Sequence, residues 1–222
     1  MVPRRAAPSG AARAYHHGNL RAALVDAGVA LARTGGPNAV VLRAVSRQAG
    51  VSHNAAYRHF ANQEDLLAAV AHQCMTRLSL LMIERMSRVT TRHRARRAQA
   101  RLEAIGRAYI DSARTEPGWF RTAFTSAQPH ADGGSRIEPA LDAAHGADPV
   151  PDPYEILSAG LDELVEAGVL TLERRPGAEY AAWSAVHGLS SLLLDGPLRE
   201  LPDTEIARAI STVLTVVSRG LA

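Results

Sequence analysis

The stretch spanning residues 42–60 constrains the fold of this chain more than any other. Its sequence is LRAVSRQAGVSHNAAYRHF. Leu42, Val45 and Ala49 recur at i, i+3 and i+7, which is the apolar spacing of one helical face. Gly50 then stands where a helix needs a left-handed residue to end. The stretch therefore predicts a short helix, a sharp corner and the start of a second helix.

The second helix has one apolar side and one polar side. Ser52 is a good N-cap, and we expect Ala55 or Ala56, together with Phe60, to face inward. The other positions carry hydrogen-bonding side chains, namely Ser52, His53, Asn54, Tyr57, Arg58 and His59. This pattern predicts a helix-turn-helix whose second helix suits the major groove of DNA. The alternative is an ordinary helical hairpin with a solvated polar face.

The charges of the chain are strongly polarised. Residues 1–101 hold sixteen Arg against four acidic residues, a net of +12, and residues 102–222 hold nine Arg against eighteen acidic residues, a net of −9. The basic half contains the proposed reading helix, so electrostatics favours a polyanionic partner for that half. Residues 1–14 are rich in Ala, Pro, Gly and Arg, and we expect them to be a disordered basic arm.

Composition favours packed helices over sheets. Of the 222 residues 46% are hydrophobic and only 5% are aromatic, and no apolar run reaches the length of roughly 18 residues that a membrane span requires. The single Cys74 excludes an internal disulfide and fits a reducing cytoplasm. We expect a soluble, cytoplasmic, all-α protein.

Apolar periodicity and breaks divide the chain into about nine helices. Besides the two helices of residues 42–60, we expect helices near 19–35, 62–88, 98–115, 117–124, 153–167, 176–194 and 203–219. The first ends at Gly35-Gly36-Pro37, and the fourth places Leu67, Val70, Cys74 and Leu78 on its buried face. Residues 127–152 are rich in Gly, Pro and Asp and predict a mobile connection. We interpret the arginines of residues 90–101 as counter-charges to the acidic half, with a DNA-backbone contact as the alternative.

Two segments carry a family resemblance. The segment 15–70, with its GVS corner at Gly50, its YRHF ending at Phe60 and its entry into a long fourth helix, resembles the DNA-binding domain of the tetracycline-repressor-like (TetR-type) regulators. Residues 183–188, WSAVHG, resemble the Trp…His-Gly motif of one branch of that family. The resemblance implies an all-α protein with a helix-turn-helix domain at 15–61 and a helical ligand-binding and dimerisation domain at 62–222, joined by the fourth helix.

The expected DNA-contacting residues follow from the reading helix and from the resemblance. His53 and Asn54 project at the start of this helix, Asn can bind adenine in a bidentate fashion, and Ala55 offers a methyl-sized contact to thymine. Tyr57 and His59 match family positions that hold phosphates. We also expect backbone contacts from the preceding helix, so the full set is Arg43, Arg47, Ser52, His53, Asn54, Ala55, Tyr57 and His59.

Two departures from the family pattern concern this region. Gln63 stands where the family usually has a Lys, so a phosphate contact is lost or weakened. Ala56 stands where a larger apolar residue is usual, which predicts a thinner core in the reading domain.

No motif identifies a ligand or a catalytic centre. His187 near Ser184 or Ser190 lacks a nucleophile elbow and an orienting third group, so we predict no enzyme, metal site or cofactor. The family places a largely apolar pocket among the fourth to eighth helices. Our candidate lining residues are Met82, Met86, Tyr109, Trp119, Phe120, Phe124, Leu161, Trp183 and His187. A structural hydrogen bond explains Trp183 and His187 as well as a ligand does.

The last two helices carry long apolar faces, and the family dimerises through this pair. The predicted dimer residues are Val186, Leu189, Leu193, Ile206, Ile210, Val213, Leu214 and Val217. The resemblance thus implies a homodimeric repressor that binds a palindromic operator on double-stranded DNA and is released by a small apolar effector. The alternative is a helical, small-molecule-binding dimeric scaffold with only non-specific DNA affinity.

Overall fold

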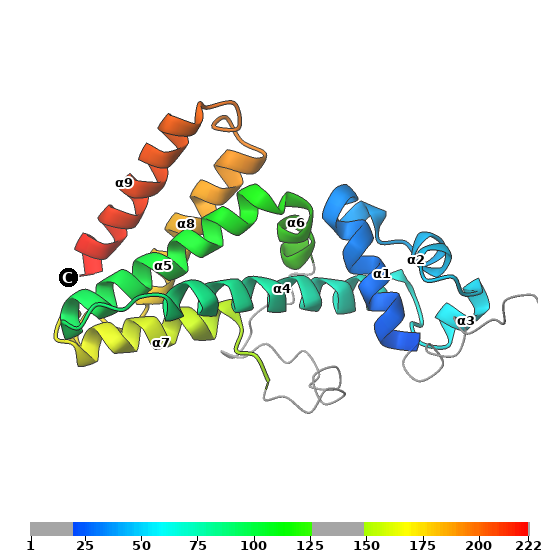
Figure 1. Ribbon diagram of the computed structural model, residues 1–222, viewed down its shortest axis with the longest axis horizontal. Helices are drawn as coiled ribbons and strands as arrows, with labels where there is room; N and C mark the ends of the chain where they lie inside the picture. The colour runs from blue at the N-terminus through cyan, green and yellow to red at the C-terminus, as the bar shows by residue number, and fades with distance from the viewer. Residues whose placement is uncertain (1–19, 126–148, 222) are drawn as a thin grey trace, which may run out of the picture.

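The computed structural model describes residues 20–125 and 149–221, and within these ranges every regular element is a helix. The expected all-α architecture is confirmed (Figure 1). The expected basic arm at 1–14 and most of the expected connection at 127–152 lie outside the described residues.

The N-terminal unit, which we call the reading head, consists of three helices and one 3-10 turn. Its elements are α1 (Leu20–Gly35), the turn η1 (Pro37–Ala39), α2 (Leu42–Gln48) and α3 (His53–Tyr57). Gly36 takes a left-handed φ of +63°, which stops α1 at the predicted place. The side chains of Leu24, Val40 and Val45 are fully buried between these elements.

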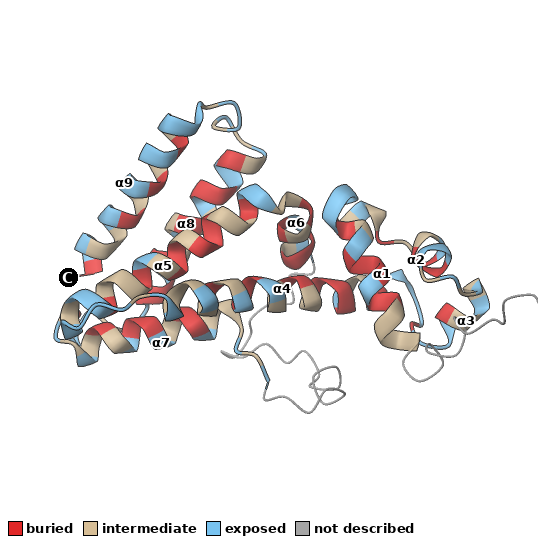
Figure 2. Ribbon diagram, in the orientation of Figure 1, coloured by how far each residue is buried: buried red, intermediate tan, exposed pale blue. Residues whose placement is uncertain are grey.

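The remaining helices form the body of the molecule. They are α4 (Gln63–Ser87), α5 (Arg94–Thr115), α6 (Pro117–Thr125), α7 (Pro153–Glu166), α8 (Ala178–Leu194) and α9 (Asp203–Leu221). The long α4 runs from the reading head into the body, while α8 and α9 lie on the far side of α5 (Figure 1). Buried positions form a stripe along each body helix on the side that faces its neighbours (Figure 2).

Among the described residues, α4 alone is long and apolar enough to cross a membrane by length and composition. It packs against α1, α5, α6 and α7, and its buried residues include Leu66, Val70, Cys74, Leu78 and Met82. Its hydrophobicity therefore belongs to the protein core. We expected Leu67 on the buried face of α4, but the fully buried residue is Leu66, because α4 turns Leu66 toward the core of the reading head.

Two helix starts differ from expectation. α5 begins at Arg94 rather than near residue 98, because the His93 ring caps the helix by accepting a hydrogen bond from the Arg96 N–H at 3.4 Å. α8 begins at Ala178, two residues after Pro176, because Gly177 adopts a left-handed φ of +76°.

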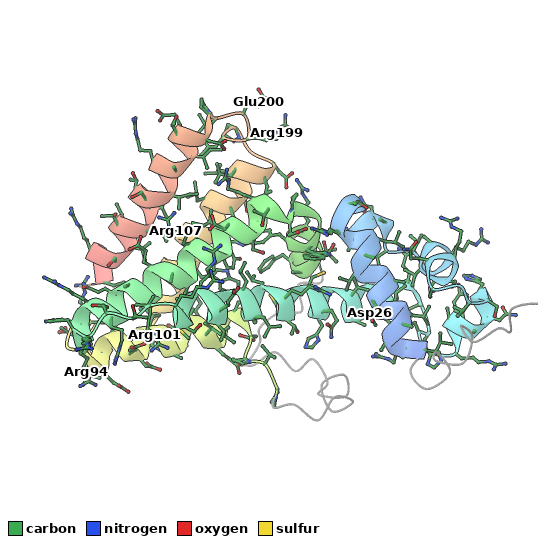
Figure 3. All side chains as sticks on the ribbon, viewed as in Figure 1. Asp26, Arg94, Arg101, Arg107, Arg199 and Glu200 are labelled. Carbon is green, nitrogen blue, oxygen red and sulfur yellow. The ribbon has the colours of Figure 1, made fainter. Side chains whose placement is uncertain are left out.

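The arginines at the start of α5 pair with acidic residues of α7. Arg94 lies 3.3 Å from Glu166, and Arg97 and Arg101 lie 3.7 and 3.1 Å from Glu163. Arg94 and Arg101 extend from α5 at the end of the body remote from the reading head (Figure 3). Their positions support the interpretation as counter-charges over the DNA-contact alternative.

Candidate DNA-binding and effector sites

The corner between α2 and α3 is held by backbone hydrogen bonds. Gly50 has a φ of +69°, a conformation that costs little only without a Cβ. The Val51 N–H then donates to the Ser46 carbonyl oxygen at 3.0 Å, and the Val51 side chain packs against the core of the reading head. Ser52 Oγ accepts a hydrogen bond from the Ala55 N–H at 3.2 Å. These contacts fix the direction in which α3 leaves the corner.

The α3 helix presents its polar side chains to solvent because its apolar side is buried. Ala56 and, just beyond the helix, Phe60 are 0% and 1% exposed, which resolves the choice between Ala55 and Ala56 as the inward residue. Asn54 is exposed, and Tyr57 is 49% exposed. The ring of His53 is half-buried against that of Tyr57, with centroids 4.7 Å apart in an edge-on arrangement.

The other proposed DNA contacts also lie on the surface of the reading head. Arg43 and Arg47 are exposed, and His59 is exposed next to the end of α3. Residues 20–61 contain five Arg against the single Asp26, a net of +4. This surface carries the charge that a polyanion requires, although its contacts to DNA remain predictions.

The two departures from the family pattern differ in position, because Ala56 is fully buried in the core of the reading head and Gln63 lies at the surface. Gln63 is the first residue of α4 and is exposed, directly after Asn62, whose Oδ1 caps the helix by accepting from the Asp65 N–H at 2.8 Å. Asp65 Oδ2 in turn accepts from the Ala61 N–H at 3.2 Å. These two hydrogen bonds fix the start of α4, of which Gln63 is the first residue.

A contact that sequence reasoning missed joins the reading head to the body. We call it the α1–α6 junction, and Trp119 is its centre. The indole Nε1–H donates to the Val29 carbonyl oxygen of α1 at 2.8 Å. The guanidinium carbons of Arg33 and Arg77 lie 5.1 and 4.8 Å from the Trp119 ring centroid, within the range of cation–π attraction.

Close backbone approach and an ion pair complete the α1–α6 junction. A Cβ on Gly118 would lie closer than 3.0 Å to the carbonyl oxygens of Ala32 and Arg33, so only glycine lets α6 approach α1 this closely. Arg33 also forms a bidentate pair with Glu116, with N···O distances of 2.6 and 2.8 Å. The P-G-W run at Pro117 could have suggested a close helix contact, but its partner on α1 was not predictable.

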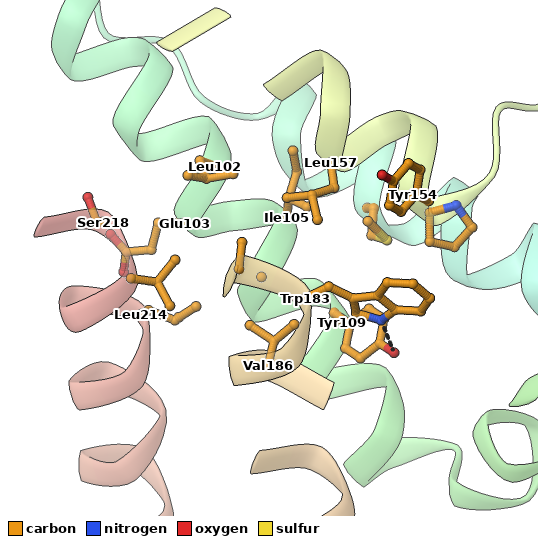
Figure 4. Close-up of a pocket in the computed structure, with 15 residues that line it drawn as sticks. Leu102, Glu103, Ile105, Tyr109, Tyr154, Leu157, Trp183, Val186, Leu214 and Ser218 are labelled. Atoms are coloured by element: carbon orange, nitrogen blue, oxygen red, sulfur yellow. Dashed lines mark hydrogen bonds between the residues drawn. The ribbon is translucent and has the colours of Figure 1, made fainter. Parts of the chain in front are cut away.

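The body contains an apolar cavity between α4, α5, α7, α8 and α9. Glu103 and Ser218 lie at one end of it, and Tyr109, Tyr154 and Trp183 lie at the other (Figure 4). Between the ends the wall is apolar and consists of Met82, Leu102, Ile105, Gly106, Pro153, Leu157, Ala182, Val186, Leu214 and Val217. Such a lining suits a largely apolar small molecule.

The aromatic end of the cavity is organised by a hydrogen-bond chain. Trp183 Nε1–H donates to the Tyr109 hydroxyl oxygen at 3.1 Å, and that hydroxyl lies 2.7 Å from His187 Nδ1. Burial lowers the pKa of His187 from its ordinary value and raises that of Tyr109. Both effects favour a neutral imidazole that accepts a hydrogen bond from the Tyr109 hydroxyl. The resemblance at Trp183 and His187 therefore corresponds to a hydrogen bond network within the protein.

Three of the nine predicted pocket residues line this cavity, namely Met82, Tyr109 and Trp183. The other six lie outside its lining. Phe120, Phe124 and His187 form an aromatic block beside Tyr109, and Met86 packs on the same core cluster. Trp119 lies at the α1–α6 junction, and Leu161 is fully buried in a separate cluster. Sequence reasoning missed most of the wall. The helical spacing of Leu102, Ile105 and Tyr109 was the available signal, although such a stripe equally describes core.

The predicted dimer residues differ in burial within the single chain, and their role in a dimer stays a prediction. Six of the eight are buried within the single chain: Val186, Leu189, Leu193, Ile206, Ile210 and Leu214. The apolar faces identified from the sequence pack on α5 and on each other, so they are already covered within the single chain. Val213 and Val217 are half-buried. The outward side of α8 is a different one and carries small residues, namely Ala181, Ser184, Ala185, Gly188 and Ser191. Leu192 of α8 and Val216 of α9 are exposed apolar side chains.

Comparison with known proteins identifies relatives of both the reading head and the body. Residues 24–70 match the family model described as bacterial regulatory proteins, tetR family, and residues 102–216 match the model described as tetracyclin repressor-like, C-terminal domain. No relative was found among curated protein sequences.

Several solved structures share the fold. One is a protein of unknown function from Rhodococcus sp. RHA1, with 24% identity, a TM-score of 0.69 and coverage of 95% of this chain and 99% of that one. Another is a tetR family transcription regulator from Shewanella sp. PV-4, with 16% identity, a TM-score of 0.56 and coverage of 91% and 97%. Together with the two matched segments, the helix-turn-helix on its glycine corner and the helical body place the chain in the TetR family of DNA-binding transcription regulators.

Proposed function

We propose that the protein is a homodimeric repressor that binds a palindromic operator through α3 and leaves it when a small molecule enters the body cavity. The observation that carries this proposal is the continuity of α4. Leu66 and Val70 of this helix are buried in the core of the reading head, while Met82 of the same helix lines the cavity. Sixteen residues of helix separate Leu66 from Met82, or about 24 Å.

A rigid helix with one end in each site couples them. A ligand that fits the cavity better when α4 is tilted stabilises the tilted state, by as much as its affinity differs between the two states. Tilting α4 moves the reading head, and two heads that no longer match successive major grooves lose their operator. The α1–α6 junction is a second connection between the body and the reading head, because Trp119 and Glu116 form hydrogen bonds with α1.

For the dimer we propose an isologous contact through the outward sides of α8 and α9. A groove between these helices is lined by Ala185, Gly188, Leu192, Thr212 and Val213 among others. A Cβ on Gly188 would meet nothing within 4 Å in the single chain, so a second backbone has room to approach. Two-fold pairing of this surface gives a four-helix contact.

Within the reading head we propose that Asn54 reads a base and that Tyr57 holds a phosphate. Both are exposed on α3, and Tyr57 is braced by the edge of His53. Gln63 would contribute a weaker phosphate contact than a Lys. The remaining candidate contacts are Arg43, Arg47, Ser52, His53, Ala55 and His59.

Selection from randomised oligonucleotides, followed by fluorescence anisotropy on the enriched duplex, tests this proposal. An enriched palindrome supports the repressor, whereas uniform weak binding of all sequences supports the scaffold alternative. Asn54→Ala should relax preference at one position per half-site and cost about 1–3 kcal/mol on the best operator. Tyr57→Phe, the matched control, should weaken all sequences alike. Unchanged base preference in Asn54→Ala would remove this residue from the readers.

A further inference from the structure

The charges around the body cavity select among ligand classes. Of the fifteen described residues that line it, Glu103 alone has an ionisable side chain that is charged at neutral pH. No arginine occurs among these described lining residues. A ligand anion would therefore meet apolar wall and one carboxylate, without a compensating cation.

Two arginines near the cavity are held by carboxylates of their own, whereas Arg219, next to Ser218 of the lining, is exposed to solvent. Arg101, adjacent to Leu102 of the wall, pairs with Glu163 at 3.1 Å. Arg175 pairs with Asp162 and with Glu179, each at 2.7 Å. Neither is available to a ligand without breaking an existing pair. Arg107 lies 3.7 Å from Glu103, but the two side chains are 39% and 54% exposed, so this pair is weak.

The position of Glu103 suits a charged group that keeps part of its hydration. Its side chain is 54% exposed, at the opposite end of the cavity from Trp183 and Tyr154 (Figure 4). A cation bound there would not have to be fully desolvated, which avoids the main cost of burying charge. At the aromatic end, the Tyr109 hydroxyl is already engaged by Trp183 and His187.

The length of the cavity follows from α5. Glu103 and Tyr109 mark its two ends and lie six residues apart on this helix, which corresponds to about 9 Å along the axis. Gly106 lies between them, and a Cβ there would approach Leu214 of α9 to 2.7 Å, so the middle of the cavity is narrow. A slender apolar body of this length fits between the two ends.

From these features we propose that the effector is a cationic amphiphile, in which an amine binds at Glu103 and a slender apolar body of about 9 Å points toward Trp183. This inference rests on the proposed function in taking the cavity as the effector site. It adds the charge and the orientation of the ligand. Neutral molecules of the same shape bind more weakly, and carboxylates are rejected.

Three probes with the same apolar body test the charge preference: octylamine, octanol and octanoate. Each is titrated by isothermal calorimetry into the full-length protein at neutral pH and low salt. Octylamine should bind about fivefold more tightly than octanol, as expected for one partly exposed ion pair. Octanoate should bind more weakly than octanol. Octanoate binding as tightly as octylamine would overturn the inference.

Variants assign the preference to Glu103. Glu103→Gln should abolish the advantage of octylamine over octanol and leave octanol binding unchanged. Arg107→Gln should tighten octylamine binding, because it removes the competing cation. Glu84→Gln is the matched control, since Glu84 forms the same kind of exposed i,i+4 pair, with Arg88, outside this cavity. An octylamine preference that persists in Glu103→Gln would refute the assignment.

The outcomes separate this inference from the proposed function. If octanol or octanoate is preferred, only the ligand class is wrong. If none of the three binds, the cavity is not the effector site, and the ligand-responsive part of the proposed function fails with the inference. Operator binding is measured separately by anisotropy, and octylamine that binds without releasing operator would contradict the repressor mechanism while leaving the ligand class intact.

Discussion

The α1–α6 junction can be opened by a single methyl group. In Gly118→Ala, the new Cβ would lie closer than 3.0 Å to the carbonyl oxygens of Ala32 and Arg33, and these are backbone atoms that cannot rotate away. To restore van der Waals contact, α6 must move from α1 by roughly 1 Å. That displacement lengthens the 2.8 Å bond between Trp119 Nε1 and the Val29 oxygen beyond hydrogen-bond range.

The expected loss of stability combines three contributions. The broken hydrogen bond costs about 1 kcal/mol, and weakened stacking of Arg77 on Trp119 costs about 0.5–1 kcal/mol. Residual overpacking adds about 1 kcal/mol. The greater helix propensity of Ala returns somewhat less than about 1 kcal/mol, because the position is in the first turn of α6. The net expectation is a destabilisation of about 2 kcal/mol, or a fall in melting temperature of about 4–8 °C.

Urea denaturation followed by circular dichroism, at one fixed protein concentration, measures this loss. Gly220→Ala is the control, because the same change of residue in the last turn of α9 meets nothing within 4 Å. Equal unfolding free energies for Gly118→Ala and wild type would show that the close approach of α6 to α1 contributes nothing, and would refute the reasoning. A loosened head should also raise the effector concentration needed to release operator, since the body then moves the head less directly.

Three further perturbations test other parts of the molecule. Gln63→Lys should tighten operator and random DNA alike at low salt and steepen the slope of log affinity against log salt by about 0.9 per half-site; parallel slopes would mean that the start of α4 does not face DNA. Leu192→Arg or Val216→Arg, at exposed positions, should yield monomers in sedimentation and abolish operator binding, whereas a monomer that binds a palindrome tightly would exclude this dimer surface. Burial lowers the pKa of His187 in the folded protein. As the pH falls from about 6.5, His187 is therefore protonated in the unfolded chain before it is protonated in the folded one. The free energy of unfolding should decline over this range, down to the pKa of the folded protein. His187→Asn should flatten that decline in urea titrations across pH, and an unchanged profile would show that His187 is not its source.

Local chemistry was sufficient to predict the elements from sequence. Gly36 and Gly50 occupy left-handed conformations just beyond the ends of their helices, as their positions after apolar stripes indicated. Ser52 and Asn62 cap helices by accepting hydrogen bonds from backbone groups three residues on. These interactions span one turn of chain, so a sequence contains both partners and their spacing.

The inward or outward direction of each apolar stripe was decided only in the folded molecule. Leu193, Ile210 and Leu214 read equally well as core or as dimer surface, because periodicity reveals that a face is apolar and not what covers it. In the structure α5 covers them, and the small-residue side of α8 is left exposed. Whether such a face becomes core or surface depends on contacts between helices that are separated by about a hundred residues in the chain.

The sequence by itself determined the approximate extent of the helices, the caps at Ser52 and Asn62, the helix-turn-helix and the polarity of α3. Only the tertiary structure decided the cavity, the hydrogen-bond chain from Trp183 through Tyr109 to His187, and the α1–α6 junction. The physical reason is the range of the interactions. Capping and periodicity act within a few residues, whereas Trp119 reaches a backbone oxygen ninety positions earlier in the chain, and no local pattern encodes that partner.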